Sequence, residues 1–155
     1  MARIAFGTMA LALMAACSTA PAPEAPQQRV LGKWNCATES DNIAISGMFD
    51  YQANGLAKSS SNIGVDAGAM QIALTADADS TWGFNADGTM TEKVTAMRLT
   101  SAKMDGRDMP PDMVAQLVQP MIDGVVGQSS TTTVVFGEDS FTSTTEEGIV
   151  TTCKR

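Results

Sequence analysis

The sequence has no histidine and is poor in aromatic residues, which make up 5% of the chain. Without histidine there is no Ser-His-Asp triad, no histidine-bearing zinc site and no imidazole base near neutral pH. The many serines and threonines are not accompanied by a Gly-x-Ser-x-Gly elbow. We therefore expect a protein that is not an enzyme, with no catalytic residues, no metal and no cofactor.

Basic residues are also scarce, with 10 Lys and Arg against 17 Asp and Glu, for a net charge of −7. Such a balance repels phosphate groups and argues against nucleic acid as a partner. It suits either a cationic partner or simple solubility. Long apolar runs are missing as well, because the apolar stretch at residues 4–16 is shorter than the roughly 20 residues that span a bilayer.

That short apolar stretch follows Arg3 and ends in Met14-Ala15-Ala16-Cys17. The arrangement resembles the lipobox of bacterial lipoproteins. The resemblance implies that residues 1–16 are a signal peptide that is removed, and that Cys17 carries acyl chains that anchor the protein to a lipid bilayer. The alternative is an ordinary secretory signal, cut near Ala16 or Ala20, with Cys17 incidental.

Ser18 follows the cysteine, and in the enteric sorting rule a residue other than Asp there directs a lipoprotein to the outer membrane. We expect the protein on its periplasmic face. Residues 17–28 contain three prolines and no large apolar group, which predicts an extended tether. Residues 29–155 are then one domain, which we expect to be a monomer.

Two cysteines remain, Cys36 and Cys153, near the two ends of this domain. In an oxidising compartment an even number of remaining thiols predicts a disulfide. A redox or metal pair is the alternative, but there is no Cys-x-x-Cys spacing. A disulfide would bring the first and last strands side by side, as in a closed barrel.

An internal repeat predicts strands and hairpins. Residues 49–55 (FDYQANG) reappear as residues 82–88 (WGFNADG), with aromatic residues and alanine at period two. Asn-Gly and Asp-Gly favour type I′ turns, so each copy predicts a tight hairpin. Outgoing strands follow at 56–63 and 89–100, and further strands fit at 30–38, 69–76, 129–136, 141–145 and 149–154. The chain is thus mainly β, with about eight to nine antiparallel strands.

One segment has helical spacing instead. Apolar residues from Met113 to Val126 recur every three or four positions, after a proline start at 110–111 and before Gly127. Pro120 lies on the polar side and is expected to kink this accessory α-helix. If the helix caps a barrel, Leu117, Val118 and Met121 face the cavity.

Gly32-Lys33-Trp34 stands at the entry to the first strand and resembles the Gly-x-Trp motif of lipocalins. The resemblance implies a small lipocalin-like β-barrel with Trp34 packed across its base and a late arginine, here Arg155, covering it. Trp34 as a plain core aromatic is the alternative. A hollow barrel would be lined by aromatic and helix residues, for which the candidates are Phe49, Tyr51, Trp82, Phe84, Leu117, Val118 and Met121.

These observations predict a lipid-anchored periplasmic protein that binds a small apolar ligand inside its barrel. The alternative is an interaction module of the cell envelope, such as an inhibitor of a basic secreted enzyme, with a filled barrel and an acidic exterior. An apolar cavity favours the first function, and a filled interior with a protruding acidic loop favours the second.

Overall fold

The computed structural model describes residues 24–155. The expected signal peptide, Cys17 and most of the expected tether lie outside the described residues. Helix α1 (Pro26–Val30) includes the last residues of that tether, which are therefore helical rather than extended. Val30 is the last residue of α1 and is fully buried. The first strand therefore begins at Gly32 and not at residue 30 as expected.

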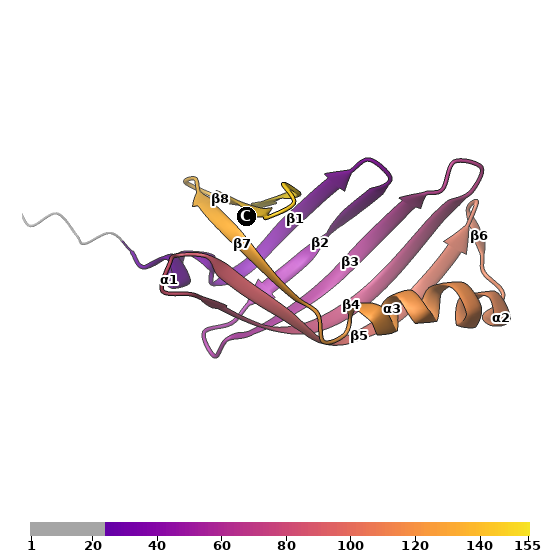
Figure 1. The fold of residues 1–155 in the computed structure, drawn as a ribbon, viewed down its shortest axis with the longest axis horizontal. Helices are drawn as coiled ribbons and strands as arrows, with labels where there is room; N and C mark the ends of the chain where they lie inside the picture. The colour runs from indigo at the N-terminus through magenta and orange to yellow at the C-terminus, as the bar shows by residue number, and fades with distance from the viewer. Residues whose placement is uncertain (1–23) are drawn as a thin grey trace, which may run out of the picture.

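The domain is a closed antiparallel barrel of eight strands with one extra strand, as the sequence predicts (Figure 1). The sheet order is β4-β3-β2-β1-β9-β8-β7-β5-β6, and a further pairing of β4 with β5 closes the barrel. The strands are β1 (Gly32–Ser40), β2 (Ile43–Tyr51), β3 (Leu56–Asp66), β4 (Gln71–Phe84), β5 (Met90–Met104), β6 (Arg107–Asp108), β7 (Ser129–Phe136), β8 (Ser140–Thr145) and β9 (Val150–Lys154).

The strand count agrees with the expectation for a partly different reason. The expected strand 69–76 and the first residues of the repeat copy, 82–84, belong to one long strand, β4, and the short strand β6 was not expected. Strand β5 carries two bulges against β4, where Thr95 and Thr100 have no opposite residue. Each of these threonine hydroxyls donates to a carbonyl of β4 at 3.0 Å. Bulges increase local twist, which helps a long strand pair curve into a barrel wall.

The repeat forms two hairpins, but not with the expected turns. Only the glycines have positive φ, 78° at Gly55 and 84° at Gly88, so neither turn is type I′. Each loop is instead a three-residue connection that ends in a left-handed glycine. Asn54 and Asp87 accept a hydrogen bond from the backbone N–H two residues further on, at 3.1 and 2.9 Å, which stabilises the non-primed turn.

The accessory helix lies between residues 107 and 129, as expected. It has three parts: α2 (Pro111–Met113), a π-helical turn η1 (Val114–Val118) and α3 (Gln119–Val125). In the π turn the N–H of Gln119 donates to the carbonyl of Val114, five residues back. This wide turn immediately precedes Pro120, which cannot donate to the usual i−4 carbonyl. The chain therefore accommodates Pro120 through a π turn.

The barrel is closed at one end and open at the other. Strand β5 pairs with β7 over only four residues, Met90 to Lys93, whereas it pairs with β4 almost along its full length. In Figure 1 the long strands β2 to β5 extend past the short strands β7 to β9, and the helices run along the edge of this extension. After the helix the chain rejoins β5, where the N–H of Gly127 donates to the carbonyl of Val94 and the N–H of Val94 donates to the carbonyl of Gln128.

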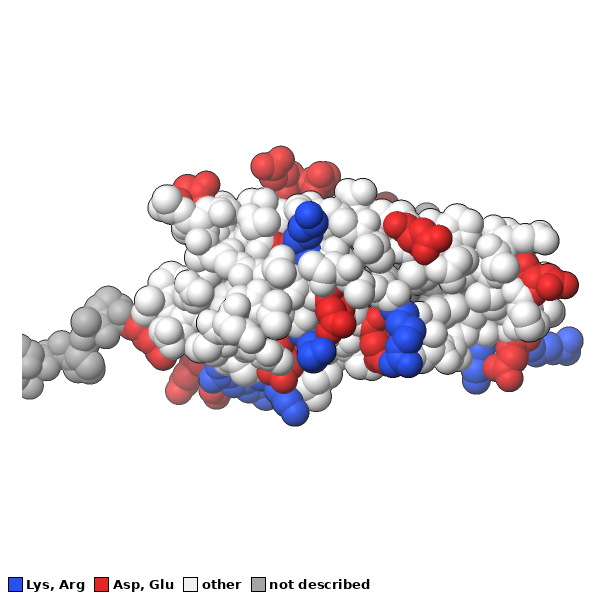
Figure 2. Space-filling model, turned by 90° about the horizontal axis from the view of Figure 1, so that it is seen from below, with Lys and Arg blue, Asp and Glu red and all other residues white. Residues whose placement is uncertain are grey.

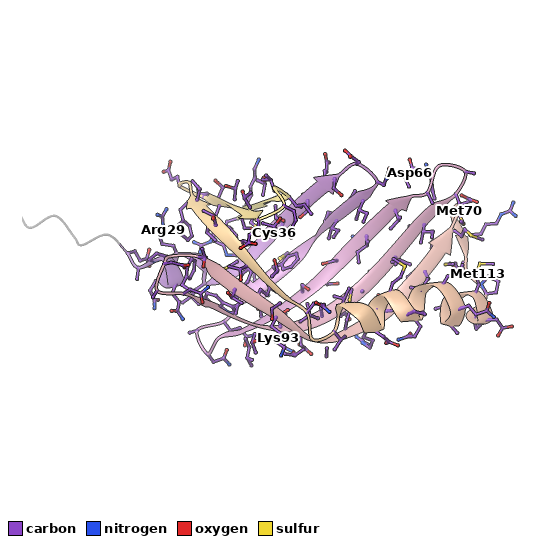
Figure 3. All side chains as sticks on the ribbon, viewed as in Figure 1. Arg29, Cys36, Asp66, Met70, Lys93 and Met113 are labelled. Atoms are coloured by element: carbon purple, nitrogen blue, oxygen red, sulfur yellow. A yellow bond between two sulfur atoms is a disulfide. The ribbon has the colours of Figure 1, made fainter. Side chains whose placement is uncertain are left out.

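Two separate hydrophobic clusters correspond to these two ends. The narrow-end cluster contains Val30, Trp34, Cys36, Tyr51, Ala57, Trp82, Met90, Phe141 and Cys153. The helix-end cluster contains Leu74, Met109, Val118 and Ile122. In Figure 3, Cys36 marks the narrow end and Met113, on α2, marks the helix end.

Candidate ligand-binding cavity

The narrow end is sealed by aromatic rings. Trp34 is 3% exposed, and its indole N–H donates to the carbonyl of Val30 at 2.6 Å. Its ring packs edge-on against Phe141 with ring centres 4.8 Å apart. The Arg155 guanidinium lies 4.2 Å from the Trp34 ring centre and donates to the carbonyls of Leu31 and Arg29. The arrangement that the Gly-x-Trp resemblance implies, a late arginine over the tryptophan, is therefore present.

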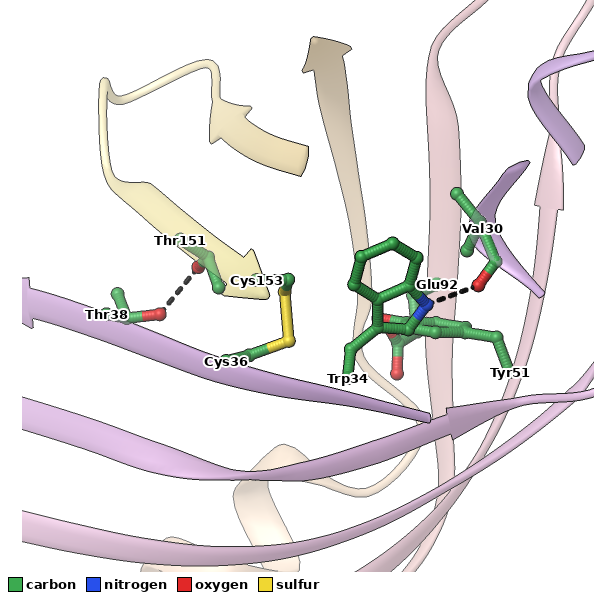
Figure 4. Close-up of a disulfide and its surroundings, with 8 residues drawn as sticks. All are labelled: Val30, Trp34, Cys36, Thr38, Tyr51, Glu92, Thr151 and Cys153. Atoms are coloured by element: carbon green, nitrogen blue, oxygen red, sulfur yellow. Dashed lines mark hydrogen bonds between the residues drawn. A yellow bond between two sulfur atoms is a disulfide. The ribbon is translucent and has the colours of Figure 1, made fainter. Parts of the chain in front are cut away.

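The disulfide between Cys36 and Cys153 joins β1 to β9 directly above this seal, with an S–S distance of 2.04 Å (Figure 4). The two cysteines lie opposite each other in the pairing of the first and last strands. Two pairs further along, the hydroxyls of Thr38 and Thr151 share a hydrogen bond of 2.5 Å. The expected disulfide and the expected adjacency of the terminal strands are both confirmed.

A cavity of about 340 Å³ lies above the seal and opens to solvent at the helix end. Its deepest residues are Tyr51, Met90 and the disulfide, all buried. Carbon and sulfur atoms form most of its surface, although Ser and Thr hydroxyls are distributed through the wall. The remaining lining residues are Thr38, Ile45, Phe49, Glu92, Val94, Val125, Gln128, Ser129, Ser130, Thr132, Ser143, Thr145 and Thr151.

One carboxylate faces this cavity. Glu92 on β5 lies opposite Trp82 of β4 and Ser130 of β7. The Tyr51 hydroxyl donates to its Oε2 at 3.2 Å, and the buried Ser80 hydroxyl bonds to the same carboxyl group. Burial raises the pKa of Glu92, while the hydrogen bonds from Ser80 and Tyr51 act in the opposite direction.

The pKa of the neighbouring Tyr51 hydroxyl is shifted as well. Burial, and next the neighbouring Glu92 carboxylate, raise the pKa of the Tyr51 hydroxyl well above its usual range. The phenol therefore stays protonated at neutral pH and serves as a hydrogen-bond donor. Figure 4 shows Glu92 and Tyr51 together near the disulfide.

Of the expected aromatic cavity residues, the structure places two at the cavity. Phe49 and Tyr51 line it. Trp82 is buried in the narrow-end cluster and donates to the carbonyl of Leu56 at 3.0 Å, while Phe84 packs against the same cluster. Trp82 and Phe84 therefore belong to the seal rather than to the cavity wall, because their positions on β4 lie beyond Ser80 toward the narrow end.

The helix residues differ more from the expectation. Val118 is buried, but it packs in the helix-end cluster with Leu74 and does not line the cavity. Leu117 and Met121 are 48% and 51% exposed and also lie outside the cavity lining, so the expectation that they point into it is wrong. The helix turns Val118 and Ile122 toward the sheet, and of its residues Val125 reaches the cavity.

Sequence reasoning missed Glu92, although a signal was available. Along β5 the inward-facing positions include Met90, Glu92 and Val94, at period two. A charged residue in the middle of an apolar face is the exception to a binary strand pattern. Such an exception marks either a paired buried charge or a functional group.

The outer surface carries both signs of charge. On the face shown in Figure 2, basic and acidic side chains are interspersed. Within residues 24–155 the ion pairs are Lys58 with Asp79 and Arg98 with Asp77, at 2.8 and 2.6 Å. None of the helices described there has the length and apolar character needed to cross a bilayer.

Neither the family models nor the curated proteins include a match to this sequence. The likeness to lipocalins rests on the barrel and on the Trp34–Arg155 pair.

Proposed function

We propose that this protein is a lipid-anchored carrier of the cell envelope that binds a small, mainly apolar molecule inside its barrel. The observation that supports binding is the cavity of about 340 Å³, which is sealed at one end by aromatic rings and open at the other. Its volume is at the lower end of the range of small-molecule pockets, and its largely apolar wall is typical of them.

The same observation favours one of the two functions that the sequence left open. A filled barrel would favour the interaction module, but the interior between the two clusters is hollow. Ligand binding is therefore the better-supported function.

Binding can be tested with N-phenyl-1-naphthylamine, an apolar probe whose fluorescence rises in apolar surroundings. We expect the parent protein to bind it and Ile45→Trp, which adds bulk at the cavity wall, to bind it at least tenfold more weakly. Val135→Trp adds an indole at a side chain that is 65% exposed and is the matched control, expected to bind as the parent does. No binding by the parent, or equal loss in both variants, would contradict the proposal.

Anchoring at the periplasmic face of the outer membrane is proposed from the lipobox alone, because Cys17 lies outside the described residues. Two or three acyl chains give lasting attachment, since each buried methylene contributes about 0.8 kcal/mol. Mass spectrometry of the mature N-terminal peptide is expected to find acyl mass on Cys17. Cys17→Ala is expected to move the protein from the membrane fraction to the soluble one, and an unmodified cysteine in the parent would refute the anchor.

A further inference from the structure

Glu92 is a feature that a purely apolar ligand does not explain. Its carboxylate faces the cavity from β5, and the residue is half-buried. Burying a carboxylate is costly unless it is paired or fully hydrogen-bonded. An apolar side chain at this position would complete the cavity wall without the free-energy cost of burying a charge.

Among residues 24–155, no Lys or Arg forms an ion pair with this carboxylate. In the part of the chain from residue 24 onward, the ion pairs involve Asp77 and Asp79, and neither Lys nor Arg lines the cavity. The groups that bond to Glu92, the Tyr51 and Ser80 hydroxyls, are neutral donors. Tyr51 is the other titratable group that lines the cavity, because Cys36 and Cys153 are joined in the disulfide.

The two hydroxyls hold the carboxylate in place without neutralising it. A carboxylate can accept about four hydrogen bonds, and these donors use two. Tyr51 on β2 belongs to the narrow-end cluster, and Ser80 on β4 is buried. The remaining acceptor positions of the carboxylate are available to a hydrogen-bond donor on a ligand that enters the cavity.

We propose that Glu92 makes the cavity selective for ligands with an apolar body and one terminal protonated amine. This inference rests on the proposed function and specifies its ligand class. The ammonium group bonds to Glu92 at the bottom of the cavity, and the apolar body lies along Ile45, Phe49 and Val94 toward the opening. A charge-assisted hydrogen bond of this kind is stronger when water is excluded.

The net charge of the chain also favours a cationic ligand. A net charge of −7 attracts cations and repels anions, which raises the local concentration of an ammonium ligand and disfavours a fatty acid. The cavity volume suits a compact amine better than a long lipid.

Three probes of equal chain length test this selectivity: octylamine, 1-octanol and octanoate, each competing with N-phenyl-1-naphthylamine at pH 7. An alkylammonium stays protonated at this pH, as lysine does. We expect octylamine to bind at least tenfold more tightly than 1-octanol, and octanoate to bind most weakly. Equal binding of octylamine and 1-octanol would overturn the inference but leave the proposed function standing, whereas failure of N-phenyl-1-naphthylamine itself to bind would overturn both.

Glu92→Gln is expected to reduce the preference for octylamine to less than threefold while leaving 1-octanol within threefold of the parent. Glu138→Gln removes the same charge from an exposed site on the β7–β8 turn and is expected to keep the tenfold preference. Equal loss in both variants would assign the preference to overall charge and refute the role of Glu92.

A pH profile of the parent provides a test that needs no variant. As pH falls through the raised pKa of Glu92, the carboxyl becomes neutral, so the affinity for octylamine is expected to fall while that for 1-octanol stays constant. In Tyr51→Phe the carboxylate loses one donor, so this fall is expected at higher pH than in the parent. A constant ratio of the two affinities in the parent would overturn the inference.

Discussion

The two ends of the barrel are built in different ways. At the narrow end, aromatic side chains from β1, β2, β4 and β8 interlock, with Trp34 against Phe141 and Tyr51 against Trp82 at ring-centre distances of 4.8 and 5.3 Å. At the other end a helix covers an extended sheet edge and buries only part of its apolar surface. The cavity lies between them.

The exposed residues of the helix show what this difference means. Leu117, Met121 and Val125 recur every four positions and are each 40% exposed or more. Val125 is also part of the cavity lining, so the exposed stripe ends at the cavity. The narrow end is thus closely packed, whereas the helix end leaves apolar side chains exposed. Stability should therefore depend mainly on the narrow end and less on the helix.

The largest expected effect is at the seal. Trp34→Ala removes a buried indole with its hydrogen bond to Val30 and its contact with Arg155, so the free energy of unfolding should fall by about 3 to 5 kcal/mol. Urea denaturation followed by circular dichroism measures this change. A loss below about 1 kcal/mol would mean that the aromatic seal does not dominate stability.

The disulfide is expected to come second. It closes a loop with a sequence separation of 117, for which the chain-entropy model gives somewhat more than 4 kcal/mol, and measured losses range from about 2 to 5 kcal/mol. Replacing both Cys36 and Cys153 by Ala should therefore lower the urea midpoint strongly. Non-reducing peptide mapping of the parent is the accompanying control, and two free thiols in protein from an oxidising compartment would contradict the bond.

The contrast between the ends also explains which features the sequence could predict. Residues 49–55 and 82–88 alternate at period two because one face of each strand is buried, so the strands followed from the pattern. The barrel was expected from the resemblance of Gly32-Lys33-Trp34 to the lipocalin motif and from the disulfide between the terminal strands. Cys36 and Cys153 followed from compartment and cysteine number. Each of these signals is local or a matter of counting.

Other features depend on three-dimensional detail. Whether Leu117 or Val118 faces the sheet is decided by the rotation of the helix, which the π turn before Pro120 changes. The turns at Gly55 and Gly88 depend on hydrogen bonds from Asn54 and Asp87 that compete with the type I′ form. The role of Glu92 needs the barrel closed, because Tyr51 and Ser80 come from other strands.

A pair of helix variants tests the partial burial directly. Ile122 is 4% exposed and packs in the helix-end cluster, so Ile122→Ala should cost about 2 to 4 kcal/mol. Leu117→Ala removes a side chain that is 48% exposed and should cost less than about 1 kcal/mol. Both free energies come from urea denaturation. Equal losses would mean that the outer stripe of the helix is covered in solution, for instance by another molecule.

The smallest expected effect is a pH dependence that comes from the cavity. The folded state raises the pKa of Glu92, so over the pH range between its usual value, about 4.3, and its raised value the folded state binds more protons than the unfolded state. The free energy of unfolding contributed by this group therefore falls as pH rises through that range. Below this pH range the carboxyl is neutral and its burial costs no ionisation energy. Above the range the carboxyl is ionised and the full cost of burying its charge lowers the free energy of unfolding.

Glu92→Gln removes this titration but keeps a side-chain oxygen that can accept from Tyr51 and Ser80. Relative to the parent, the variant should gain stability as pH rises from about 4 toward neutrality, because only the parent has to ionise a buried carboxyl. Urea midpoints of both proteins at several pH values give the difference, in which the other carboxyl groups cancel. A difference that does not change with pH would mean that Glu92 ionises as freely in the fold as in water, so that the cavity holds no carboxylate destabilised by burial.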